Sequence, residues 1–131
     1  MVTVLEENIP QNAPSRIRYE IETALIRIGV PSNIKGWDYT VSAICMVVQD
    51  RNAIHTVTYG MYRDIAAAYG TSYTCVERGI RHLIETAYER GDLSELEKCV
   101  GFPNPKTGKL ANSEFISNFA RHIWYKVNGY N

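Results

Sequence analysis

The side chains best suited to chemistry lie in residues 72–82, which read SYTCVERGIRH. Hydroxyl, thiol, carboxylate, guanidinium and imidazole groups follow one another here, in a run that also fits the period of a helix. The guanidinium of Arg78 can donate two hydrogen bonds to one guanine, and the carboxylate of Glu77 can accept one from a cytosine amino group. The short polar first turn suits a helix that enters the major groove of DNA with its N-terminal amides facing phosphate. These residues therefore favour recognition of DNA.

The expected helix has two different faces. At about 100° per residue, Arg78 lies nearest the centre of a polar face that also holds Thr74, Arg81 and Glu85. Glu77 precedes Arg81 by four residues, so it can orient that guanidinium instead of contacting a base. The opposite face is an apolar stripe made of Val76, Ile80, Leu83, Ile84 and Ala87. One face is thus expected to pack into a core while the other stays free.

A simpler interpretation of the same helix stays open. Arginine and glutamate on an outer face also describe a helix that is merely solvated, and periodicity does not distinguish the two. His82 fits a surface or capping histidine as well as a contact to phosphate. Gly79 costs about 1 kcal/mol relative to alanine in mid-helix, and it indicates close packing with another helix rather than chemistry.

Catalysis is not expected. Cys75 and His82 lie seven residues apart on one helix, about 10 Å at about 1.5 Å per residue, which is too far for a thiol and an imidazole to pair directly. Glu85 and Glu89 lie one turn apart without a partner that would form a pocket. The chain is therefore not expected to be an enzyme.

No metal or cofactor site is expected either. The three cysteines are an odd number without CxxC or zinc spacing, which argues against a disulfide framework and a structural metal site. The histidines are scattered over three segments and form no ligand motif. These residues are Cys45, Cys75, Cys99, His55, His82 and His122.

Residues 61–90 are predicted to form a helix-turn-helix. Its second helix, over residues 72–90, is the one expected to read DNA and is called the reading helix below. Ala66 stands where two helices would cross, and a larger side chain would hold them apart. Gly70 permits a left-handed turn between the two helices. Val76 of the second helix is expected to pack against the first helix. This Ala, Gly and Val spacing fits the general helix-turn-helix template.

Four more helices surround this pair. Ser15 is the expected N-cap of the first, Gly91 the glycine that ends the reading helix, and Asp92 with Glu95 a capping box for a short helix. The last helix is expected to be capped near Asn112. The predicted ranges are about 15–28, 37–49, 92–100 and from 112 onward, with a connector over 52–60 and a loop over 102–109. No strand is convincing, so the expected fold is all-α, a six-helix domain containing a helix-turn-helix.

Chain length and net charge limit the number of domains and the kind of partner that can be expected. The 131 residues suggest one domain over 15–131, preceded by a flexible tail or linker remnant over 1–14. The net charge is zero and the pI is near 6.8, whereas isolated DNA-binding domains usually carry a basic excess. Any DNA affinity must then come from local placement of charge. The sequence contains no signal peptide and no membrane-spanning stretch, which predicts a cytoplasmic protein without membrane association.

Three segments of the chain together resemble a known family. These segments are IGVPSNIKGW, the long run DIAAAYGTSYTCVERGIRHLIETAYERGDL, and NSEFI. They are similar to the C-terminal DNA-binding domain of stage-zero sporulation protein A, a response regulator, over about residues 16–125. The resemblance implies six helices and a recognition helix that reads a TGTCGAA-type box in double-stranded DNA. It also implies tandem binding by two protomers and activation or repression of transcription.

The resemblance also indicates which residues meet DNA. We expect base contacts from Thr74, Cys75, Glu77 and Arg78. We expect phosphate contacts from Ser72, Tyr73, Arg81, His82 and Lys35. The segment 91–101 resembles the family's surface for the sigma factor of RNA polymerase.

Three departures from the family bear on function. Cys75 stands where the family carries a base-reading arginine, so the target sequence is expected to differ. Ala67 and Ala68 replace lysines, which explains part of the neutral charge. The family's N-terminal receiver domain is also missing, so the sequence is either an excised domain or a stand-alone homologue, and the start at Met1 favours the second. These departures also motivate an alternative, an interaction module that binds a full-length regulator or sigma factor rather than DNA.

Overall fold

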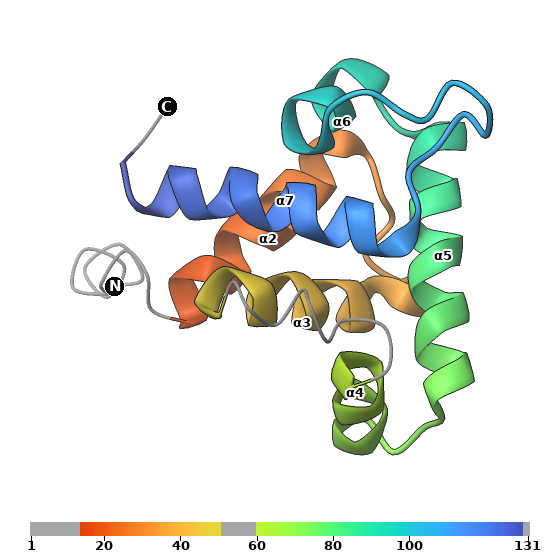
Figure 1. The fold of residues 1–131 in the computed structure, drawn as a ribbon. Helices are drawn as coiled ribbons and strands as arrows, with labels where there is room; N and C mark the ends of the chain where they lie inside the picture. Colours follow the sequence, from red (N-terminus) through yellow and green to blue (C-terminus); the bar gives the residue numbers. More distant parts are fainter. Residues whose placement is uncertain (1–13, 51–59, 130–131) are drawn as a thin grey trace.

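The structure is a computed structural model, and it describes residues 14–50 and 60–129. These residues form six helices and no strand, as the sequence predicts. In chain order the helices are α2 (Pro14–Ile28), α3 (Gly36–Gln49), α4 (Tyr62–Ala68), α5 (Tyr73–Arg90), α6 (Leu93–Val100) and α7 (Asn112–Val127) (Figure 1). The expected tail, apart from Pro14, and nearly all of the expected connector over 52–60 lie outside the described residues.

Helix α3 is the centre of the bundle and packs against α2, α5 and α7. Figure 1 shows α5 running along one side of the molecule, crossing the ends of α3 and α7. Both of these helices begin beside α5 and run away from it. Their positive N-terminal ends therefore lie next to the helix expected to read DNA.

The apolar stripes of the sequence form the core, because each predicted stripe faces the neighbouring helices. Helices α2 and α7 each bury an apolar stripe at helical spacing, and α5 buries its whole predicted stripe. The buried residues are Ile17, Ile21, Leu25 and Ile28 of α2, Val76, Ile80, Leu83, Ile84 and Ala87 of α5, and Phe115, Ile116, Phe119, Ile123 and Val127 of α7. Side chains of this size each contribute about 1.5–3 kcal/mol when fully buried. Cys45 of α3 is only half-buried.

The helix-turn-helix is formed as predicted by α4 and α5. Ala66 and Val76 are buried at 4% and 0% exposure, where the two helices cross. Gly70 has a φ of 63°, the left-handed conformation that turns the chain between them. Within the described ranges, no helix is long and apolar enough to cross a membrane.

Three helix ends differ from the prediction. Ser15 lies inside the first turn of α2, which begins at Pro14, because proline fits the first turn of a helix without losing a hydrogen bond. Gly91 is extended at φ −82° rather than left-handed; it must be glycine because a Cβ there would lie 2.5 Å from the Ala87 carbonyl oxygen. Helix α7 is capped from Ala111, whose N–H donates to the Glu114 carboxylate at 3.2 Å. Asp92 does cap α6, accepting from the Glu95 N–H at 3.2 Å.

Candidate nucleic-acid interface

Helix α5 is fixed to the domain by a contact between two backbones. A Cβ on Gly36 would lie 2.0 Å from the carbonyl oxygen of Gly79, and a Cβ on Gly79 would lie 2.9 Å from Cδ2 of Tyr39. Only a pair of glycines allows the start of α3 to approach α5 this closely. The helix-packing interpretation of Gly79 is thus confirmed, and the contact holds the middle of α5 in one position.

The first turn of α5 is anchored by its own cap. The Ser72 hydroxyl accepts the Cys75 N–H at 3.1 Å, which leaves its proton available to another acceptor. Thr74 is exposed beside it, while Tyr73 is half-buried with its ring centroid 5.8 Å from that of Tyr62. Ser72 therefore has a structural role, and Tyr73 is partly committed to packing.

The outward face of α5 carries one arginine that is in an ion pair and one that is not. Arg78 and Arg81 are both exposed, as is His82. Arg81 pairs with Glu77 at 3.2 Å, the i,i+4 pairing that the sequence allows. Arg78 makes no ion pair with any residue in the described ranges. Its guanidinium is therefore the one on this face whose donors are not already directed at a carboxylate.

On one flank of this face, Lys35 lies beside Cys75. The Lys35 ammonium Nζ lies 3.9 Å from the Cys75 sulfur, although the residues are 40 positions apart in the chain. A hydrogen bond with Thr71 and the nearby charge of Lys35 lower the pKa of the Cys75 thiol below its ordinary value. At this point of the helix the structure thus has a thiol with a lysine ammonium next to it.

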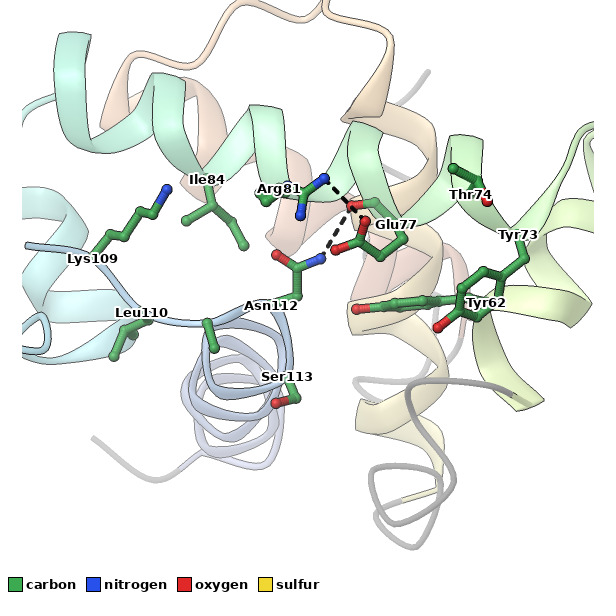
Figure 2. Close-up of a pocket in the computed structure, with 11 residues that line it drawn as sticks. Tyr62, Tyr73, Thr74, Glu77, Arg81, Ile84, Lys109, Leu110, Asn112 and Ser113 are labelled. Carbon is green, nitrogen blue, oxygen red and sulfur yellow. Dashed lines mark hydrogen bonds and ion pairs between the residues drawn. The ribbon is translucent and has the colours of Figure 1, made fainter. Parts of the chain in front are cut away.

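A cavity of about 510 Å³ lies on the opposite flank of α5. Figure 2 shows the residues that line it, which come from α4, α5, the loop before α7 and the first turn of α7. The Asn112 amide donates to the Glu77 carbonyl oxygen at 3.2 Å, and Lys109 pairs with Glu85 at 2.6 Å. This hydrogen bond of Glu85 with Lys109 lowers the pKa of the Glu85 carboxyl.

Sequence reasoning missed Tyr62, Lys109 and Asn112 as neighbours of the reading helix. Lys109 and Asn112 lie 24 and 35 residues beyond their partners on α5, so no local pattern connects them. The signal available was the NSEFI segment, whose first residue is Asn112. Of the other expected features, Ala67 and Ala68 are exposed on α4, and α6 exposes Leu93, Glu97 and Lys98.

A comparison with known protein families shows to which family the chain belongs. The family model described as the C-terminal domain of sporulation initiation factor Spo0A matches residues 21–123, most of the chain. The chain belongs to this family.

The family match spans all the expected DNA-contacting residues. It runs from within α2 to within α7 and so includes the whole helix-turn-helix. The family consists of regulatory DNA-binding domains of sporulation, not of enzymes. Among the residues described, no group of histidine, cysteine, aspartate or glutamate side chains is arranged to hold a metal ion.

Proposed function

We propose that this member of the Spo0A C-terminal family is a sequence-specific regulator of transcription that places α5 in the major groove. The observation that carries the proposal is the exposed Arg78, which has no ion-pair partner among the described residues and lies at the centre of a helix face anchored by the Gly36–Gly79 contact. Base contacts come from Thr74, Cys75, Glu77 and Arg78. Phosphate contacts come from Ser72, Tyr73, Arg81, His82 and Lys35.

Local charge explains how a protein of zero net charge could bind DNA. Lys35 and Arg78 flank the reading face without a carboxylate partner in the part of the chain described. The N-termini of α3 and α7 lie beside α5 and add the partial positive charge of a helix dipole there. Under this proposal, local charge would make the field at the DNA surface positive although the whole chain is neutral.

The target is proposed to be a variant of the TGTCGAA box. Arginine reads guanine through two hydrogen bonds, whereas a cysteine behaves as a small apolar side chain with a weak S–H donor. Cys75 therefore favours contact with the methyl group of a thymine over the edge of a guanine. The box position that faces Cys75 is where the preference should depart from that of the family.

Two partners are proposed beside DNA. A second copy of the chain would bind a tandem box, and the sigma factor of RNA polymerase would contact segment 91–101. The exposed Leu93, Glu97 and Lys98 on α6 supply an apolar and charged surface for that contact. It lies apart from the N-terminal half of α5, so DNA and sigma factor would be bound together (Figure 1).

A second candidate function is an interaction module that binds a full-length regulator or sigma factor without DNA. The observation in its favour is that Arg81 and Lys109 are held by Glu77 and Glu85, which reduces the charge available to phosphate. A salt-titrated binding assay with a TGTCGAA duplex and a scrambled duplex separates the two functions. Salt-dependent binding with preference for the box supports the regulator. No duplex binding at low salt, together with a stable complex with sigma factor, supports the module.

A further inference from the structure

The cavity beside α5 opens next to the surface proposed to read DNA. Thr74 and Arg81 belong both to the exposed face of α5 and to the cavity lining. Its other walls are Tyr62 from α4 and residues 109–113, where the chain enters α7 (Figure 2). A group bound in the cavity would therefore touch α5 from the side opposite Lys35.

The first turn of α7, whose amides can donate hydrogen bonds, borders this cavity. The first amides of a helix have no acceptor within the helix. The N-cap residue, Ala111, has no side-chain oxygen that could accept a hydrogen bond from them. Asn112 and Ser113 line the cavity at this point, and Lys109 brings an ammonium group three residues before the helix. Free amides at a positive helix end beside a cation form the usual setting for a bound phosphate.

The Tyr62 hydroxyl supplies an independent reason to expect a ligand. Tyr62 is 1% exposed, and its hydroxyl has no hydrogen-bond partner among the described residues. Figure 2 shows it directed into the cavity toward Asn112 and Ser113. The Asn112 amide is close enough to act on the Tyr62 pKa in the lowering direction, but the hydrogen bond it makes goes to the Glu77 carbonyl oxygen at 3.2 Å. Burial raises the pKa of Tyr62 to about 12, so the hydroxyl keeps its proton and can donate it. A buried donor without an acceptor calls for an explanation, and an anion in the cavity provides one.

Two carboxylates face the same region. Glu77 lines the cavity and pairs with Arg81, and Glu85 pairs with Lys109 at 2.6 Å. They hold both cations beside the cavity, and a phosphate would have to share them. Free phosphate is therefore expected to bind here weakly but saturably, and a phosphate presented by a larger bound molecule is expected to bind more tightly.

We propose that this cavity binds a phosphate group of the DNA backbone, through the first amides of α7, the Lys109 ammonium and the Tyr62 hydroxyl. The inference rests on the proposed DNA binding. A helix in the major groove has a sugar–phosphate backbone on each side. Lys35 faces the backbone on one flank of α5, and the cavity would hold the backbone on the other.

Matched variants test this site. Lys109→Gln should lower the affinity for boxed and scrambled duplexes alike, and should flatten the salt slope by about one unit, because one phosphate contact is lost. Lys106→Gln is the control, since Lys106 lies exposed in the same loop without lining the cavity. Tyr62→Phe should weaken duplex binding while the melting temperature stays the same or rises, because the lost hydroxyl has no partner in the free protein.

Two further measurements make the result specific. In the double variant Glu85→Gln/Lys109→Gln, affinity should stay low; full recovery would mean that Lys109 only neutralises Glu85, which would overturn the inference. A duplex carrying one neutral methylphosphonate at successive backbone positions should locate the phosphate. One position should weaken the wild type but not Lys109→Gln, and the absence of any such position would contradict the site.

Failure of this inference can be told apart from failure of DNA binding. If the wild type binds the duplex but Lys109→Gln and Lys106→Gln share its salt slope and Tyr62→Phe keeps full affinity, the cavity holds no backbone phosphate. If the wild type binds no duplex, a titration with inorganic phosphate tests the cavity directly. The binding is monitored through the NMR signals of the Asn112 and Ser113 amides. Saturable shifts that disappear in Lys109→Gln support a phosphate site, and unchanged signals overturn it.

Discussion

The Lys35 ammonium lies 3.9 Å from the Cys75 sulfur and joins the start of α3 to the first turns of the reading helix. The lysine is held there because Gly36, the next residue, packs against Gly79 of α5. The Cys75 thiol, on one flank of the proposed DNA surface, therefore lies beside a positive charge.

This contact predicts that Cys75 is the most reactive cysteine at neutral pH. The thiolate is the reactive form, and a lowered pKa moves its formation to lower pH, whereas burial raises the pKa of Cys45 and raises that of Cys99 to about 11. Iodoacetamide labelling followed by mass spectrometry should show Cys75 modified first. Bound duplex should protect it, and Cys75→Ser should remove the fast phase. Faster labelling of Cys45 or Cys99 would contradict the prediction.

Arg78 is predicted to carry base recognition. Arg78→Ala should weaken binding to the preferred box by about 1–3 kcal/mol and relax the preference at one base position, because a bidentate contact to guanine is lost. Selection from a randomised duplex pool, with wild type and variant side by side, measures both effects. Equal affinity of wild type and variant for the best box would rule out the base-reading role.

Arg81 is predicted to act on the backbone instead. Arg81→Ala should weaken binding to boxed and scrambled duplexes equally and reduce the salt slope by about one unit. The substitution also frees the Glu77 carboxylate, its partner at 3.2 Å, so Glu77→Gln/Arg81→Ala serves as the control for repulsion by that group. A change in base preference in Arg81→Ala that Glu77→Gln alone does not show would assign Arg81 to base reading.

Gly79 gives a stability test in which two effects have opposite signs. Helix propensity alone predicts that Gly79→Ala stabilises the protein by about 1 kcal/mol. The added Cβ would lie 2.9 Å from the Tyr39 ring and 3.3 Å from the Gly36 Cα, and such overpacking costs about 1–3 kcal/mol. We expect the free energy of unfolding, measured by urea denaturation, to fall. An increase would show that the two helices can separate without loss.

The sequence by itself determined the helices and their buried faces, because helical periodicity is a local property. The stripe from Val76 to Ala87 and the turn at Gly70 could be predicted from residues a few positions apart. The same local motifs determined the family. The errors fell at helix ends such as Ser15 and Gly91, where neighbouring chain segments decide the conformation.

Only the tertiary structure decided which distant residues surround the reading helix. Lys35 meets Cys75 across 40 residues, and Asn112 meets Glu77 across 35. These contacts depend on how α3 and α7 cross α5, and the crossing depends on the close approach of Gly36 to Gly79. Periodicity assigns a residue to a face of its own helix but does not specify what lies opposite. For that reason periodicity predicted the reading face but not the contacts on its two flanks, and Lys35 was expected near DNA only from the family resemblance.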